Sequence, residues 1–493
     1  MSHSESTDTA VTPVVLAGAV TTGERTATLT TPHETITYRV RAETLPVTEE
    51  RFEDGYRGLT PIADVFTTSY VRVDDEGRPD VSRPVVFTFN GGPGSSTVWL
   101  HLGLFGPRLV SSGDVGNRTP PPYGIVDNPD SLLAEADLVF IDPMSTGFTR
   151  AADGVEPSRF HGFTGDRDLV GQTILRWLSD NGRWTSPKFL AGESYGTTRA
   201  TALAGWLASR HGVAFNGLIL ISTVLDFATI RFTPGNDAPY LHYLPTYAAD
   251  AWFHGFHPGR DLEDVVAEAE DFVRDGYRIA LERGHRLATA DRTAVAERVA
   301  ALVGVSAEYV LRSNLRIEHK RYFAELLRDA GQMVGRLDGR ITAPLRDAML
   351  EAQENDPAND FIRYPYTAVI NGYLRDELGC RTALDYEVYS DRVQPWSYSE
   401  FENSSVYTGE DLAGAMRQNP HMAVYCAFGY FDGSTPFAAS EHVLAHLPIS
   451  PLDYSRIERH YYKAGHMMYV HEPSRLEQSR HIAEFVRAAV ATV

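Results

Sequence analysis

Residues 192–196 read Gly-Glu-Ser-Tyr-Gly, so that Ser194 stands between two glycines. A short apolar run that predicts a buried strand precedes this motif (188–191), and a helical pattern follows it (197–210). A Gly-x-Ser-x-Gly sequence between a strand and a helix holds the serine hydroxyl on a sharp turn, from which it can attack a carbonyl carbon. We therefore predict that Ser194 is the nucleophile of an acyl-transfer reaction. The alternative is a glycine-rich loop that only caps the helix.

A serine nucleophile needs a histidine base and a carboxylate that orients it, and on a strand–turn–helix scaffold the carboxylate precedes the histidine in the chain. Asp432 lies in a turn-rich stretch after the apolar run 423–428, and His466 follows the last strand-like segment, 456–463. We predict that Asp432 is the acid and His466 the base. An ordinary turn aspartate and a surface histidine are the alternatives. Weaker candidates, which precede or lie within a strand or lie close to the final helix, are Asp453, His460, His471 and His481.

A glycine-rich loop follows the first buried strand, where residues 90–96 read Asn-Gly-Gly-Pro-Gly-Ser-Ser. Such a loop lets backbone N–H groups approach the nucleophile, and the tetrahedral oxyanion of an acyl transfer requires such donors. We expect one donor to be the N–H of Tyr195, the residue after the nucleophile, and the second to come from this loop. Taken alone, the loop is equally well explained as a plain tight turn.

Short and almost wholly apolar runs recur on both sides of these motifs, as is typical of strands buried on both faces of a parallel sheet. They are 85–89, 138–141, 188–191, 218–221 and 423–428. Their alternation with helical segments predicts a doubly wound, mostly parallel α/β sheet. Two earlier segments with alternating polarity, 35–40 and 69–73, predict antiparallel edge strands.

The stretch between the two sets of strands has mainly helical patterns. Helices are predicted at about 262–273, 294–303 and 320–334. We therefore expect three parts in the chain, which are the first part of the core (1–225), an inserted helical cap (226–396) and the second part of the core (397–493).

The composition is that of a folded, acidic protein, with 493 residues, 43% hydrophobic residues and a formal net charge of −20. This charge argues against a nucleic acid or an anionic membrane surface as partner. No run approaches the roughly 20 apolar residues of a membrane span. The sequence carries no signal for an oligomeric state.

Only two cysteines occur, Cys380 and Cys426, whereas secreted hydrolases of this size often contain several disulfides. The start of the chain is polar and acidic, and the apolar stretch 13–20 is short and has no basic region before it. We therefore predict no secretory signal, a reducing compartment and a cytoplasmic protein.

Three motifs, in this order, resemble those of the serine carboxypeptidases. They are Asn-Gly-Gly-Pro-Gly-Ser-Ser at 90–96, Gly-Glu-Ser-Tyr at 192–195 and Gly-His-Met at 465–467. The resemblance covers about 84–221 and 423–469, and it implies an α/β-hydrolase fold with an inserted helical cap.

By resemblance, the chain hydrolyses C-terminal peptide bonds of a peptide substrate through an acyl-enzyme, with no metal and no other cofactor. An esterase, amidase or acyltransferase with the same triad is the alternative. A non-catalytic binding module is disfavoured because nucleophile, acid and base are all present. The resemblance implies a catalytic triad of Ser194, Asp432 and His466, oxyanion-hole donors at Gly92 and Tyr195, and binders of the substrate's terminal carboxylate at Asn90, Gly91 and Glu193.

The sequence departs from the family pattern in three ways. Ser95 replaces the usual cysteine of the glycine-rich loop, which removes the family's disulfide there, and we expect no secretory signal. Both features indicate an intracellular, bacterial-type member. In addition, Leu104 stands where the family often has a glutamate, so that Glu193 lacks its usual carboxyl partner. An isolated glutamate is expected to ionise at lower pH than a member of a glutamate pair, and burial, which disfavours the charged form, is the opposing effect.

Overall fold

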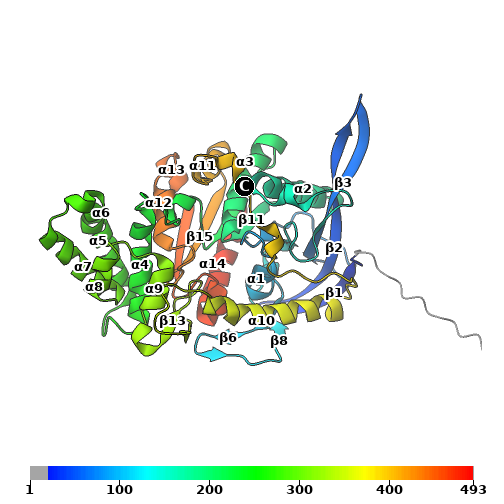
Figure 1. The fold of residues 1–493 in the computed structure, drawn as a ribbon. Coiled ribbons are helices and arrows are strands. Elements are labelled where there is room, and N and C mark those ends of the chain that lie inside the picture. Colours follow the sequence, from blue (N-terminus) through cyan, green and yellow to red (C-terminus); the bar gives the residue numbers. More distant parts are fainter. Residues whose placement is uncertain (1–19, 492–493) are drawn as a thin grey trace, which may run out of the picture.

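The computed structural model describes residues 20–491, and these form one central sheet of ten strands with helices packed on both faces (Figure 1). Residues 1–19, which bear on the predicted absence of a secretory signal, lie outside the described residues. In spatial order the strands are β1 (Gly23–Thr30), β2 (Thr35–Phe52), β3 (Tyr56–Arg72), β9 (Asp137–Ile141), β4 (Val85–Phe89), β11 (Lys188–Glu193), β12 (Gly217–Ile221), β15 (Ala423–Gly429) and β16 (Ile457–Tyr462), and β10 (Arg150–Ala151) pairs with β3.

The six strands from β9 to β16 in this order are parallel, and β1, β2 and β3 join them as an antiparallel edge. The long β2 and β3 extend beyond the rest of the sheet as a protruding hairpin (Figure 1). Strands β4, β9, β11 and β12 are buried along their whole length. Their apolar runs form the parallel part of the sheet, which confirms the predicted fold class.

Side chains of the sheet alternate between two hydrophobic layers because successive residues of a strand point to opposite faces. In β4, Val86 packs in one layer, whereas Val85 and Phe87 pack in the other. The first layer is covered by α14 and the second by α2 and α3. The helices of the core are α1 (Val98–Leu100), α2 (Phe163–Asp180), α3 (Tyr195–His211), α11 (Gly409–Gln418), α12 (Phe437–Ala445), α13 (Pro451–Tyr454) and α14 (Glu472–Ala491).

The chain between β12 and β15 is mainly helical, and most of it packs beside the sheet around a hydrophobic cluster of its own (Figure 1). Leu244, Val265 and Leu302, from three different helices, belong to this cluster. Besides α11, the helices of this region are α4 (Ala238–Phe253), α5 (Leu262–Phe272), α6 (Arg278–Arg283), α7 (Thr289–Val303), α8 (Ala307–Arg312), α9 (His319–Glu325) and α10 (Pro357–Gly372).

The predicted helix 320–334 is wrong in its second half. Helix α9 ends at Glu325, and Gln332–Val334 form the strand β13, which pairs with β14 (Thr342–Pro344). Gly331 has a φ of +68°, a conformation that ends helical structure and favours glycine. Two further small ladders pair β5 (Arg108–Ser111) with β8 (Gly124–Asp127) and β6 (Gly113–Asp114) with β7 (Asn117–Arg118).

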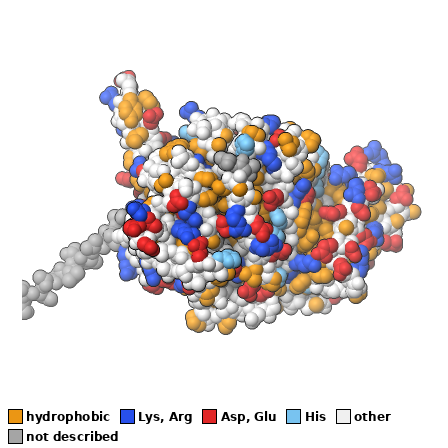
Figure 2. Space-filling view, turned by 180° about the vertical axis from the view of Figure 1, so that it is seen from behind, with side chains coloured by type: hydrophobic (Ala, Val, Ile, Leu, Met, Phe, Trp, Pro, Cys, Tyr) orange, Lys and Arg blue, Asp and Glu red, His pale blue; other side chains and the backbone are white. Residues whose placement is uncertain are grey.

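Charged side chains of both signs lie intermingled on the face shown in Figure 2, so the negative net charge does not form a single-sign surface there. Across residues 20–491, no helix combines the length and the apolar character that crossing a bilayer would need.

Both cysteines are buried as free thiols. Cys426 lies on β15 and Cys380 in the hydrophobic layer beneath α14. Burial raises the pKa of Cys380 to about 11 and that of Cys426 to about 12, so both thiols stay neutral at physiological pH.

We predict that dithiothreitol leaves the melting temperature unchanged, because the fold contains no Cys380–Cys426 disulfide to reduce. Thermal unfolding with and without reductant measures this. As a control, a thiol titration of the denatured, unreduced protein should count both cysteines as free. A reductant-induced drop of several degrees would contradict the assignment of two free thiols.

Candidate active site

Ser194 occupies a strained turn between the end of β11 and the start of α3. Its φ of +59° lies in a region that non-glycine residues rarely adopt. The flanking glycines are required, since a Cβ on Gly192 would lie 2.1 Å from the carbonyl oxygen of Gly196. The backbone N–H of Ser194 donates to the carbonyl of Ile221 on the neighbouring strand (3.0 Å). The turn thus presents the hydroxyl at the N-terminus of α3, as the motif predicts.

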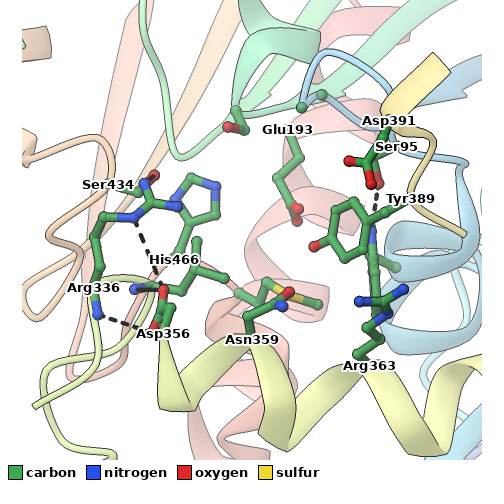
Figure 3. A pocket seen from close by; sticks show the side chains of 16 residues that line it. Ser95, Glu193, Arg336, Asp356, Asn359, Arg363, Tyr389, Asp391, Ser434 and His466 are labelled. Atoms are coloured by element: carbon green, nitrogen blue, oxygen red, sulfur yellow. Dashed lines mark hydrogen bonds and ion pairs between the residues drawn. The ribbon is translucent and has the colours of Figure 1, made fainter. Parts of the chain in front are cut away.

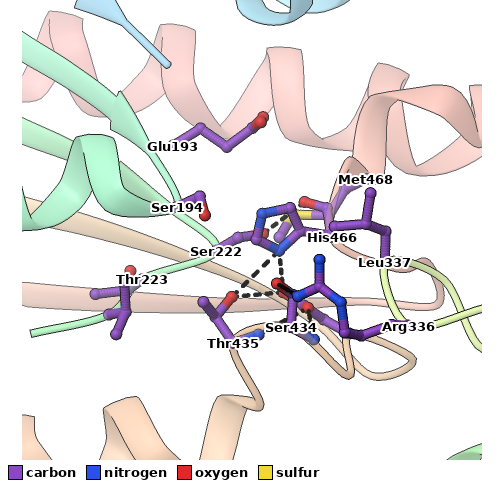
Figure 4. Close-up of polar contacts among 12 residues, drawn as sticks. Glu193, Ser194, Ser222, Thr223, Arg336, Leu337, Ser434, Thr435, His466 and Met468 are labelled. Atoms are coloured by element: carbon purple, nitrogen blue, oxygen red, sulfur yellow. Dashed lines mark hydrogen bonds and ion pairs between the residues drawn. The ribbon is translucent and has the colours of Figure 1, made fainter. Parts of the chain in front are cut away.

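The structure brings Asp432 and His466 together beside this turn. The Nδ1 of His466 lies 2.8 Å from Oδ2 of Asp432, and the His466 side chain lines the same cavity as Ser194 (Figure 4). No hydrogen bond joins Ser194 Oγ to His466 within residues 20–491. Catalytic contacts of this kind are often long until substrate binds. The three side chains can therefore act as nucleophile, base and orienting acid.

Asp432 is fully buried, and hydrogen bonds hold it in place. Its Oδ1 accepts from the backbone N–H groups of Ser434 (2.8 Å) and Thr435 (2.9 Å), and its Oδ2 accepts from the Thr435 hydroxyl (2.7 Å) as well as facing His466. Donors from the turn after β15 thus compensate for the loss of water around the carboxylate.

The backbone of His466 is anchored on both sides. Its N–H donates to the carbonyl of Leu337 (2.6 Å), and its carbonyl accepts from the Ser222 hydroxyl (2.5 Å). Burial by itself lowers the pKa of His466, but the negative charge of Asp432 and the hydrogen bond to it outweigh burial and leave the pKa raised. The imidazole is therefore held in position and is a stronger base than a free histidine.

The glycine-rich loop after β4 packs against the start of α3. A Cβ on Gly91 would lie 2.4 Å from the backbone nitrogen of Tyr195 and 2.7 Å from the carbonyl oxygen of Glu193, so only glycine fits. Gly92 has a φ of +106° and lines the cavity. The N–H of Tyr195 is the first of α3 and has no acceptor within the helix. Of the two predicted oxyanion-hole residues, Gly92 thus lines the cavity, whereas Tyr195 contacts the loop at Gly91 and is not among the residues that line the cavity.

A buried ion pair between α3 and α2 holds this loop through a hydrogen bond to its backbone. Arg199 on α3 pairs with Asp166 on α2 (Nε–Oδ2, 2.6 Å), and its Nη1 donates to the carbonyl of Asn90 (2.6 Å). Both charged side chains are nearly inaccessible to solvent. The sequence analysis missed this pair. The only available signal was a charged residue on the buried face of α3, five positions after Ser194.

Glu193 is buried at the cavity wall and is held by two neutral donors. The Asn90 amide donates to Oε1 (2.9 Å) and the Tyr469 hydroxyl to Oε2 (2.7 Å). Burial raises the pKa of Glu193 to about 7, although both hydrogen bonds and the nearby His466 oppose the rise. Burial, which the sequence analysis named as the opposing effect, is thus the largest influence on this carboxyl and keeps its pKa near neutrality without a second glutamate.

Asn90, predicted to bind substrate, does not line the cavity. Its side chain is fully buried, with its amide on Glu193 and its Oδ1 accepting from the Leu100 N–H (3.2 Å). It therefore orients Glu193, whereas Gly91 and Glu193 do line the cavity.

The Tyr469 hydroxyl contacts Glu193, whereas the resemblance expects a second glutamate at position 104 as its partner. Leu104 packs in the hydrophobic core, 1% exposed, and does not line the cavity. Tyr469, which the sequence analysis missed, follows the Gly-His-Met motif by two residues, and that proximity was the signal that could have identified it.

The cavity has a volume of about 400 Å³ and lies between the core and the inserted helical region (Figure 3). The core lines it with Gly91, Gly92, Glu193, Ser194 and His466. The inserted region lines it with Arg336, Leu337, Asp356, Asn359 and Arg363. The sequence analysis missed these last five, because the inserted region matched no motif. The described residues contain no group of three or more His, Cys, Asp or Glu arranged to hold a metal ion.

Comparisons with known proteins bear on the fold. No protein-family model matches the chain. A stretch of 123 residues is 28% identical to the serine carboxypeptidase-like protein 37 of Arabidopsis thaliana, which corresponds to 24% of this chain and 23% of that relative. The crystal structure of Kex1Δp, a prohormone-processing carboxypeptidase from Saccharomyces cerevisiae, aligns with a TM-score of 0.56 over 91% of both chains at 14% sequence identity. At this identity the structural match shows the fold.

Together, the strand order and the structural match show that the chain has an α/β-hydrolase fold. Within that class, its resemblance to the serine carboxypeptidases is confirmed, since a protein of that name aligns in sequence and a carboxypeptidase aligns in structure.

We predict that Gly91→Ala lowers kcat on an activated ester by roughly a hundred-fold, the typical effect of losing one oxyanion donor. The added Cβ would meet the Tyr195 backbone nitrogen at 2.4 Å and push the loop away from α3. Gly116→Ala is the matched control, because a Cβ there has no neighbour within 4 Å. Equal kcat values for two folded variants would show that the loop does not form the oxyanion hole.

Proposed function

We propose that the chain is a serine carboxypeptidase that removes C-terminal residues from peptides, with Ser194 as nucleophile, His466 as base and Asp432 as orienting acid. The observation that carries the proposal is Glu193, a buried carboxyl with a pKa of about 7 at the wall of the cavity that Ser194 and His466 line. A protonated carboxyl can donate a hydrogen bond to the terminal carboxylate of a peptide. The names of the sequence relative and of the structural neighbour support this proposal.

In the proposed reaction, His466 takes the proton of Ser194 as Oγ forms a bond to the carbonyl carbon of the scissile peptide. The N–H groups of Gly92 and Tyr195 stabilise the oxyanion. His466 then gives the proton to the leaving nitrogen, the C–N bond breaks, and an acyl-enzyme on Ser194 remains. Water, activated by the same imidazole, hydrolyses that ester and restores the serine.

Glu193 serves as the recognition group of the proposed site. Below its pKa of about 7 it is neutral and can donate to the substrate's carboxylate, whereas above that pH its negative charge repels the same group. Asn90 and Tyr469 hold both oxygens in one orientation, so that the acidic hydrogen can point into the cavity. The glycine-rich loop lines the same wall of the cavity as Glu193.

We propose that residues 226–396 form a cap on the core parts 1–225 and 397–493, since Arg336, Asn359 and Arg363 of this region complete the cavity. We also propose that the protein works in a reducing compartment such as the cytoplasm. The two buried, free thiols support that setting.

Ser194→Ala should abolish the release of C-terminal residues, with a loss of roughly 10⁴-fold or more in kcat. The measurement is amino-acid release from an N-blocked peptide with a free C-terminus, beside its C-terminal amide and a simple ester. The melting temperature of the variant checks its fold. Normal release by Ser194→Ala would remove the proposed nucleophile, and ester hydrolysis without release from any free-acid peptide would replace the carboxypeptidase with an esterase.

The KM for free-acid peptides should rise as pH increases through about 7, because Glu193 loses the proton with which it binds carboxylate. On the acid side, kcat should fall below the raised pKa of His466, because the base becomes protonated. The Tyr469 hydrogen bond lowers the pKa of Glu193, so Tyr469→Phe should move the rise in KM to higher pH.

The control for this shift is Tyr366→Phe, a nearby buried tyrosine without a hydrogen bond to Glu193 in the described part of the chain. The readout is KM against pH for one peptide with a free and with an amidated C-terminus. A parallel rise of KM for the amidated peptide would show that Glu193 does not bind the substrate's carboxylate. Identical KM profiles for wild type and Tyr469→Phe would show the same.

A further inference from the structure

The wall of the cavity that faces Glu193 is built by helix α10. Asn359 and Arg363 are four residues apart on this helix, so they lie on one face, and both side chains line the cavity (Figure 3). Arg363 is exposed at the mouth, and Asn359 is partly buried beside it. Among residues 20–491, neither side chain has a hydrogen-bond or ion-pair partner. A free guanidinium and a free amide thus face the place where substrate must lie.

The second arginine at this wall is already engaged. Arg336 Nη1 donates to the Ser434 hydroxyl (2.5 Å), and its Nε lies 3.9 Å from Asp356 Oδ2. Asp356 in turn accepts backbone N–H groups from Arg336, Leu337 and Ala358 (3.0 to 3.1 Å). Its negative charge is therefore compensated locally. Of the two arginines that line the cavity, Arg363 is the one without a hydrogen-bond or ion-pair partner among the described residues.

One further charge lies at the cavity. Asp391 is exposed at its rim and has no ion pair within the described residues, so it is not within salt-bridge distance of Arg363. Its charge weakens the attraction of the cavity for an anion without neutralising the guanidinium. A single substitution, Asp391→Asn, would therefore make the cavity more attractive to an anion.

The position of the base decides which part of the substrate meets α10. His466 must protonate the leaving nitrogen, so the leaving residue lies in the cavity that His466 lines. Its terminal carboxylate is assigned to Glu193 by the proposed function. The side chain of the leaving residue then extends toward the opposite wall, where Asn359 and Arg363 present five guanidinium and two amide N–H donors.

We propose that Arg363, assisted by Asn359, binds a carboxylate on the side chain of the leaving residue, so that peptides ending in glutamate or aspartate are the preferred substrates. This inference rests on the proposed carboxypeptidase function. The guanidinium fork matches a carboxylate in two parallel hydrogen bonds, and the Asn359 amide adds a third donor. Hydrogen bonds to charged groups of this kind correspond to a preference of about ten- to a hundred-fold.

The test compares two N-blocked peptides that differ only in a C-terminal glutamate or glutamine. Wild type should show a kcat/KM for the glutamate peptide about ten-fold or more above that for the glutamine peptide, and this ratio should fall with ionic strength because Arg363 is exposed. Arg363→Ala should bring the ratio close to one, because kcat/KM should fall much further for the glutamate peptide than for the glutamine peptide. Arg363→Lys should keep part of the preference, because it retains the charge and loses the fork.

Two further variants sharpen the result. Arg210→Ala, which removes an exposed arginine at the end of α3 that lies outside this cavity, should keep the wild-type ratio. Asp391→Asn should raise the ratio by removing the opposing charge. If wild type releases glutamate and glutamine at equal rates, or if Arg363→Ala slows both peptides equally, the inference is wrong while the carboxypeptidase stands. If neither peptide is cleaved, the proposed function itself has failed.

Discussion

The whole site depends on one steric constraint, the contact between the loop after β4 and the first turn of α3. The backbone of Gly91 lies so close to the nitrogen of Tyr195 that a Cβ would come within 2.4 Å. Strands β4 and β11 must therefore end at the point where α3 begins, and the parallel pairing of the two strands provides that arrangement. The Arg199–Asp166 pair stabilises it from below, since it joins α3, α2 and the Asn90 carbonyl through buried, charge-assisted hydrogen bonds. A positive φ at Ser194 is the strain that this convergence produces.

A second consequence of this packing is the burial of Glu193, the last residue of β11. A charged carboxylate at such a position would be costly, so burial raises its pKa toward neutrality. In a pair of glutamates, like-charge repulsion also raises the pKa of one carboxyl, and the size of the rise depends on the protonation state of the other. Here the partners of Glu193 are the neutral Asn90 amide and the Tyr469 hydroxyl, so Glu193 is the group that changes its charge while these two donors stay neutral. Desolvation, and not charge repulsion, therefore adjusts the proton affinity of Glu193.

The sequence predicted those features that depend on local pattern. Apolar runs located the parallel strands, and the strand–turn–helix motif located Ser194, because each signal lies within a few neighbouring residues. The roles of Asn90 and Tyr469 could not be predicted from resemblance, because they depend on which side chains meet Glu193 across long sequence separations. The helix expected at 320–334 failed in its second half because the pairing of β13 with β14 overrode the helical pattern after Gly331. Arg363 lies in a region without motifs, and only the placement of α10 brings it to the cavity.

The position of α10 in turn depends on how the glycine-rich loop is tied to the inserted region. Where the family resemblance expects a cysteine, Ser95 accepts a hydrogen bond from the Trp99 indole (2.6 Å). The Trp99 ring packs on Tyr366 of α10 and on Tyr389, with centroid distances of 5.0 and 5.2 Å. Backbone hydrogen bonds also join the loop to the segment around residue 389. A hydrogen-bonded aromatic cluster thus connects the glycine-rich loop with the helix that carries Arg363. Unlike a disulfide, this cluster needs no oxidising environment to form. In the proposed enzyme, the triad lies in the core and Arg363 on the inserted region, and the contacts of Trp99 join these two parts.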